Sequence, residues 1–164
     1  MALSERGFIF FLLTLFLVTS QIHSETIYST PNDAPGISTN HAKILNEYGC
    51  KIPVTISGWD VDFLVSGNFA DSSQEDLAVL CKKNENNYIK IFWGGENQCN
   101  DEISSWGESL EAVDGEYIIN HYEAYGGPEP SNITHQAIND IMLGKSSIVY
   151  YCSNGSWLEF TGAD

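Results

Sequence analysis

The amino-acid sequence predicts an α+β fold built from antiparallel β-hairpins, arranged as two blade-like units, with two short helices. Residues 88–93, 147–152 and 156–161 are rich in aromatic and β-branched residues, which favours strands. Residues 38–48 and 114–125 instead space their apolar side chains as a helix does. Gly and Asn cluster between these segments, which favours short turns and hairpins.

Residues 1–24 are predicted to be a signal peptide. Arg6 lies in a short leading segment, an apolar run follows over residues 8–18, and Ser20 and Ser24 offer cleavage points. The run is shorter than the roughly 20 residues that cross a bilayer. We therefore expect a periplasmic or secreted protein whose mature chain has no membrane span. An uncleaved membrane anchor is the alternative.

Residues 25–37 are predicted to be an extended lead-in, because Pro31 and Pro35 fall in a stretch without apolar periodicity. Residues 38–164 are long enough for a single α+β domain with one core. Ser38, Thr39 and Asn40 are suitable N-caps for the first helix, and Gly49 is placed to end it. Pro53 then predicts an end to regular structure around residues 51–52.

The middle of the chain predicts a strand over residues 59–65 and a hairpin after it. Residues 77–81 are almost entirely apolar, which indicates a strand buried on both faces. A polar turn over residues 82–87 leads to the alternating strand at 88–93. Residues 97–109 show no clear pattern, with Cys99 and Trp106 as their only obvious anchors.

The second helix should begin near Asp114 and end at Gly126. Asn154-Gly155 joins the last two strands and is a strong hairpin signal. Asp76 and Asp140 each precede an apolar run, a turn and an aromatic strand, and this repetition is the basis for predicting two blade-like units. Chance similarity between two hairpins is the alternative.

The segment that begins Gly67-Asn68-Phe69-Ala70-Asp71 and runs to residue 95 resembles one unit of the FG-GAP-like repeats. Residues 45–164 resemble small exported bacterial proteins of uncharacterised function that carry this FG-GAP/VCBS-like motif. The resemblance implies a β-hairpin opened by a calcium-binding acidic loop. In this chain Ser72-Ser73 replaces the central acid–Gly pair, so we expect no cofactor, with calcium as the alternative. The candidate metal ligands are Asn68, Asp71, Glu75 and Asp76.

The four cysteines, Cys50, Cys81, Cys99 and Cys152, all follow the predicted signal peptide. An even number in an exported chain predicts disulfides, and three pairings are open; a buried free thiol at Cys81 or Cys152 is the alternative. The cysteine spacing matches neither a zinc knuckle nor a thioredoxin-like motif.

The net charge of −15 limits the classes of partner. The seven basic residues are Arg6 in the signal peptide and lysines scattered through the rest of the chain, so the sequence has no basic stripe. Nucleic acid is therefore excluded as a partner, and a basic protein is favoured. The alternative is that the charge only keeps an exported protein soluble.

His121, His135 and Asp140 are the only group of residues that suggests acid–base chemistry, and their spacing matches no metal or protease motif. The content of Trp and Tyr is high, and aromatic rings beside carboxylates and amides can form a saccharide or peptide surface. The candidate binding residues are His121, Tyr122, Tyr125 and His135.

We therefore predict an exported, non-enzymatic binding domain that recognises a protein or a cell-envelope component. One alternative is a hydrolase of envelope material that uses Asp or Glu with His121 or His135. Another is a calcium-stabilised FG-GAP-like module.

Overall fold

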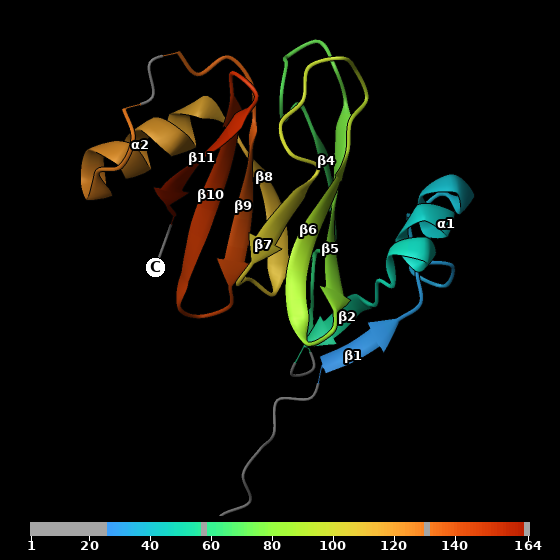
Figure 1. The fold of residues 1–164 in the computed structure, drawn as a ribbon. Coiled ribbons are helices and arrows are strands. Elements are labelled where there is room, and N and C mark those ends of the chain that lie inside the picture. The colour runs from blue at the N-terminus through green and yellow to red at the C-terminus, as the bar shows by residue number, and fades with distance from the viewer. Residues whose placement is uncertain (1–25, 57–58, 130–131, 163–164) are drawn as a thin grey trace, which may run out of the picture.

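The computed structural model describes residues 26–56, 59–129 and 132–162, and the predicted signal peptide lies outside these ranges. The chain has an α+β fold with antiparallel strands and two short helices (Figure 1). The strands form a three-stranded sheet, β1-β2-β3, and two four-stranded sheets, β4-β5-β6-β7 and β8-β9-β10-β11. Helices α1 and α2 lie on opposite sides of the molecule (Figure 1).

The three-stranded sheet contains β1 (Thr26–Ser29), β2 (Ile52–Ile56) and β3 (Trp59–Asp60), with β2 in the centre. Strand β1 belongs to the segment that we expected to be a lead-in. The expectation that Pro53 ends regular structure is wrong, because Pro53 lies inside β2. It pairs with Tyr28 where the register shifts, and such an irregular position tolerates the missing N–H of proline.

Helix α1 (Thr39–Tyr48) connects β1 to β2 and confirms the predicted helix. Ser38 accepts a hydrogen bond from the backbone N–H of His41, which satisfies one of the free donors of the first turn. Gly49 has a φ of 85°, the left-handed conformation that commonly ends a helix.

The first four-stranded sheet runs through β4 (Leu64–Gly67), β5 (Asp76–Lys83), β6 (Asn86–Phe92) and β7 (Glu102–Ser105) in chain order. Its central hairpin, β5–β6, confirms the predicted one. The turn is shorter than expected, because Asn84 and Glu85 both have positive φ and form a tight connection. The strand predicted over residues 59–65 is divided between β3 and β4.

The second four-stranded sheet contains β8 (Ser109–Val113), β9 (Ala137–Met142), β10 (Ser146–Ser153) and β11 (Ser156–Thr161), again in chain order. Helix α2 (Gly115–Tyr125) connects β8 to β9 and confirms the second predicted helix. Asn154 and Gly155 form the predicted turn between β10 and β11, both with positive φ. Strands β7 and β8 lie in or next to the segment for which the sequence showed no pattern.

The repetition around Asp76 and Asp140 is not kept in register. Asp76 is the first residue of β5, where it pairs with Gly67. Asp140 lies in the middle of β9, opposite Leu110. With its three sheets, the fold is therefore larger than the two hairpin units that we predicted.

The main core joins the two four-stranded sheets through buried apolar side chains, among them Leu80, Ile89, Ile138 and Tyr150. A smaller cluster, which includes Val113, Ile118 and Phe160, packs beneath α2. Two disulfides, Cys50–Cys81 and Cys99–Cys152, select one of the three possible pairings. No helix in the described ranges is both long and apolar enough to cross a membrane.

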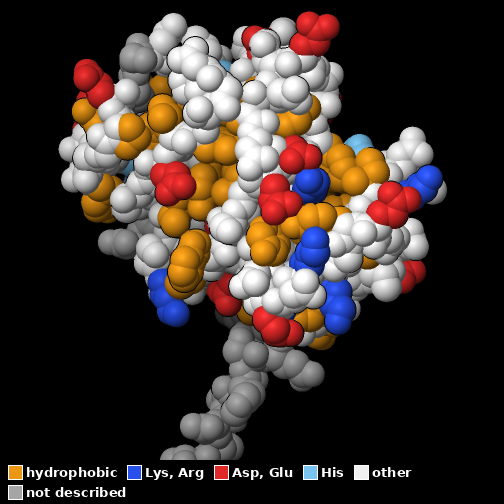
Figure 2. Space-filling model, in the orientation of Figure 1, with side chains coloured by type: hydrophobic (Ala, Val, Ile, Leu, Met, Phe, Trp, Pro, Cys, Tyr) orange, Lys and Arg blue, Asp and Glu red, His pale blue; other side chains and the backbone are white. Residues whose placement is uncertain are grey.

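Several lysine side chains on the surface contact acidic ones. Lys82 contacts Glu85 at 3.1 Å, and Lys90 contacts Asp101 at 2.8 Å. Figure 2 shows one face of the molecule, on which lysine side chains lie close to acidic ones and apolar side chains lie between them.

Candidate functional site

Trp106 is the most exposed large hydrophobic side chain among the described residues, with 72% of its surface accessible. It follows β7 and begins the connection between the two four-stranded sheets. Single exposed apolar residues are common on protein surfaces, so exposure alone indicates little. What distinguishes Trp106 is how firmly its backbone is held.

The side chain of Asp140 fixes the backbone of Trp106 through hydrogen bonds. Asp140 lies in the middle of β9 and is only 2% exposed. Its Oδ2 accepts hydrogen bonds from the backbone N–H groups of Trp106, at 3.1 Å, and Gly107, at 3.3 Å. Its Oδ1 accepts one from the Ser105 hydroxyl at 2.9 Å. Burial raises the pKa of Asp140, while these three hydrogen bonds favour the carboxylate and oppose the shift.

Further contacts fix the same connection. A Cβ atom on Gly107 would collide with Asp140 Oδ1, so only glycine allows this close approach. Asn87 donates from Nδ2 to the Gly107 carbonyl at 3.3 Å. Tyr150 donates its hydroxyl to the Ser104 carbonyl at 3.3 Å, and burial raises the pKa of this phenol and keeps it protonated. The backbone around Trp106 is thus ordered while the indole ring is left in solvent.

A cleft of about 480 Å³ opens beside Trp106. It lies between the β5–β6 turn, the beginning of β6 and the end of β7. None of its lining side chains is aliphatic. Amides, hydroxyls and two aromatic rings therefore meet at one place on the surface. The cleft is lined by Glu85, Asn86, Asn87, Tyr88, Ser104, Ser105 and Trp106.

Of the candidate binding residues on α2, His121 and Tyr125 lie along the helix next to Tyr117, whereas Tyr122 faces the core. The His121 ring stacks on Tyr117 with 4.0 Å between ring centroids, and its Nδ1 lies 2.8 Å from the Tyr117 carbonyl oxygen. Tyr122 packs against the cluster beneath the helix. Tyr125 is 53% exposed and lies 6.0 Å from His121, measured between ring centroids.

His135 lies in a different place, next to the loop between β4 and β5, which we call the acidic loop. Its ring stacks on Tyr151 at a centroid distance of 4.3 Å, and its Nδ1 lies 2.9 Å from the Gln136 carbonyl oxygen. It lines a cavity of about 310 Å³ together with Asn68 and Asp114. The carboxylate of Asp140 is bonded to the Trp106 backbone instead. His121, His135 and Asp140 each have different hydrogen-bonding partners.

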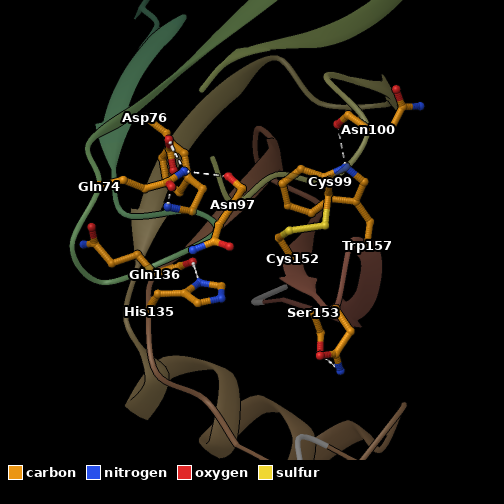
Figure 3. The surroundings of a disulfide bond; sticks show 12 residues. Gln74, Asp76, Asn97, Cys99, Asn100, His135, Gln136, Cys152, Ser153 and Trp157 are labelled. Atoms are coloured by element: carbon orange, nitrogen blue, oxygen red, sulfur yellow. Dashed lines mark hydrogen bonds between the residues drawn. A yellow bond between two sulfur atoms is a disulfide. The ribbon is translucent and has the colours of Figure 1, made fainter. Parts of the chain in front are cut away.

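In the acidic loop, backbone and side-chain amide groups donate hydrogen bonds to the carboxylate of Asp76 (Figure 3). Asp76 is 1% exposed and accepts hydrogen bonds from the backbone N–H groups of Phe69 and Gly94, both at 2.9 Å. The Gln74 side chain donates to Asp76 at 2.7 Å and to the Asn97 carbonyl at 2.8 Å. An amide nitrogen therefore contacts oxygen atoms of the kind that would face a cation.

The remaining candidate ligands make other contacts, and the Asn68 amide donates to the Gln74 carbonyl. Glu75 is exposed. The Ser73 hydroxyl and backbone N–H both donate to Asp71, and they are the main reason why the pKa of Asp71 lies below its usual value. In the described part of the chain, no group of three or more His, Cys, Asp or Glu side chains is arranged to hold a metal ion.

Trp93 and Trp157 stack on each other with 5.8 Å between ring centroids. Trp157 donates its indole N–H to the Asn100 carbonyl at 2.9 Å, next to the Cys99–Cys152 disulfide (Figure 3). These two rings are partly buried and pack against each other, whereas the Trp106 ring contacts solvent. Comparison of the chain with models of protein families, with curated proteins and with solved structures gave no match.

Proposed function

We propose that this protein is an exported, non-enzymatic binding domain that recognises a protein or cell-envelope component through the Trp106 cleft. The observation that carries the proposal is the exposed Trp106 indole on a backbone fixed by the buried Asp140. Tryptophan is among the side chains most enriched at binding hot spots. Holding its backbone in place before the ligand arrives reduces the entropy lost on binding.

Two features support export. The apolar run near the N-terminus has the length of a signal-peptide core. Both disulfides also require an oxidising compartment to form and persist, which is typical of the periplasm and of secreted proteins.

We also infer that each four-stranded sheet is a blade-like unit. The strands of each sheet follow one another in chain order as an antiparallel meander, as in a propeller blade. Residues 106–108 form the connection between the two units. A binding residue on such a connection is supported from both sides by rigid sheets, which favours precise placement.

The mature protein and its Trp106→Ala variant can test this function. Each would be immobilised and exposed to a solubilised cell-envelope fraction, and the retained mass would be recorded by biolayer interferometry. We expect the wild type to retain envelope material and Trp106→Ala to lose most of it, because the large aromatic contact surface is gone.

Ile119→Ala is the matched control, since Ile119 is 44% exposed but lies on α2, away from the cleft lining. It should retain as much material as the wild type. Equal retention by the wild type and Trp106→Ala, or none by either, would contradict the proposed function.

A further inference from the structure

We infer that the ligand of the Trp106 cleft is an uncharged saccharide. This inference rests on the proposed function and names the ligand class of the same site. Four properties of the cleft carry it: the exposed ring, the orientation of the amides, the lack of aliphatic side chains, and the charge.

The ring supplies the apolar half of the recognition. The face of an indole is flat, large and electron-rich. One face of a pyranose ring presents C–H groups, which are weakly positive and stack on such a surface. Because Trp106 is 72% exposed and its backbone is hydrogen-bonded to Asp140, a sugar ring can approach the indole without rearranging the loop.

The amides supply the polar half. The Nδ2 of Asn87 is bonded to the Gly107 carbonyl at 3.3 Å, and the Nδ2 of Asn86 is bonded to the Asn84 carbonyl at 3.3 Å. Both amide orientations are thereby set, and each leaves its oxygen to accept a hydrogen bond from a ligand hydroxyl. Ser104 and Ser105, which also line the cleft, come from the neighbouring strand β7.

The lining argues against a peptide as the main ligand. Peptide and protein partners are usually anchored by side chains that fill apolar, desolvated pockets. The Trp106 cleft has rings, amides, hydroxyls and one carboxylate, but no Leu, Ile, Val, Met or Ala among its lining residues. A ligand rich in hydroxyl groups matches this surface better than an apolar side chain does.

Charge restricts the saccharide further. Glu85 is the only charged residue that lines the cleft, and it is paired with Lys82 at 3.1 Å, so the repulsion comes from the net charge of −15 of the whole chain. Uronic or sulfated sugars would be repelled by this field and would find no lysine or arginine in the lining. An uncharged saccharide is not repelled, and its affinity should not depend on salt.

The experiment is isothermal titration of the mature protein with defined oligosaccharides. The uncharged probes are cellohexaose, laminarihexaose, maltohexaose and chitohexaose in its fully N-acetylated form; the charged probes are oligogalacturonate and a basic lysine-rich peptide. We expect at least one uncharged probe to bind and the oligogalacturonate not to bind. Affinity for the uncharged probe should be unchanged between low and physiological salt.

Variants locate the binding. Trp106→Ala should weaken the uncharged probe by at least about tenfold, the loss expected of a hot-spot aromatic residue. Asn87→Ala should also weaken binding, and Ile119→Ala should bind as the wild type does. Binding of an uncharged probe that is unaffected by Trp106→Ala would overturn the inference.

The two proposals can fail separately. Trp106-dependent capture of envelope material together with no binding of any uncharged oligosaccharide would refute the saccharide and leave the binding function standing. Binding of the lysine-rich peptide alone, weakened by Trp106→Ala and by salt, would assign the cleft to a basic protein. The absence of any Trp106-dependent binding would refute both proposals.

Discussion

Asp140 Oδ2 accepts a hydrogen bond from the backbone N–H of Trp106 at 3.1 Å, so that one of the most buried carboxylates supports the most exposed large side chain of the described residues. The two residues are far apart in sequence. They meet because β9, which contains Asp140, pairs with β8, the strand that directly follows the connection. The contact therefore links the stability of the fold to the position of the Trp106 backbone at the edge of the cleft.

Asp140→Ala should lower both stability and binding. It leaves the N–H groups of Trp106 and Gly107 without their acceptor and creates a cavity, and together these changes should reduce the free energy of unfolding by about 2–4 kcal/mol. Urea denaturation measures this loss. A variant as stable as the wild type would show that the carboxylate does not anchor the loop.

Asp140→Asn should change how stability depends on pH. Burial raises the pKa of Asp140 in the folded protein, so the folded state binds this proton more tightly than the unfolded chain does. The contribution of Asp140 to the stability of the wild type should therefore fall as pH rises from about 3.9, the unfolded value, through the raised folded value.

The amide that Asp140→Asn introduces cannot ionise, so this variant should gain stability relative to the wild type as pH rises across that window. Urea denaturation of both proteins at a series of pH values isolates this difference, because the other titrating groups are shared. A difference that stays constant with pH would contradict the assigned shift.

The Cys99–Cys152 disulfide should contribute strongly to stability. It closes a loop with a sequence separation of 53 residues and joins the segment before β7 to β10. The Cys99→Ala/Cys152→Ala variant should lose about 3–5 kcal/mol of unfolding free energy, which urea denaturation measures. In the wild type, alkylation under denaturing, non-reducing conditions should modify no cysteine, and four alkylated cysteines would disprove the pairing.

Calcium should have little effect on stability. Three N–H donors already surround the Asp76 carboxylate, and one of them is the Gln74 amide. A bound ion would stabilise by about 2.7 kcal/mol at a hundredfold excess over its Kd. Thermal unfolding with and without millimolar calcium tests this. A rise in Tm of several degrees that is lost in Asp76→Ala would restore the calcium module.

Local patterns were sufficient for the elements that carry their own signals. Helix α1 has a capping Ser38 and a terminal Gly49, and the β10–β11 hairpin has Asn154-Gly155 at its turn. Strands β7 and β8 lack such signals, because Ser and Glu interrupt their short apolar pattern. They are strands because β6 and β9 provide partners from other parts of the chain.

The candidate site was less accessible to sequence reasoning. Trp106 stood out as an aromatic anchor, but only the tertiary structure shows that its ring faces solvent. The sequence contained one signal for this site, which was Asp140, an acidic residue in the middle of a strand. We grouped it with His121 and His135 for acid–base chemistry, whereas its carboxylate holds the Trp106 backbone.

The most direct test of the Trp106 cleft is the indole N–H region of the ¹H–¹⁵N spectrum of the mature protein. The chain contains four tryptophans, and a Trp106→Phe variant identifies the Trp106 resonance by its loss. On titration with cellohexaose, laminarihexaose, maltohexaose and fully N-acetylated chitohexaose in turn, we expect the Trp106 resonance to shift with at least one of them while the Trp93 and Trp157 resonances stay in place. Shifts at Trp93 or Trp157 with Trp106 unmoved, or no shift at Trp106 with any of the four, would contradict the assignment of the cleft as the saccharide site.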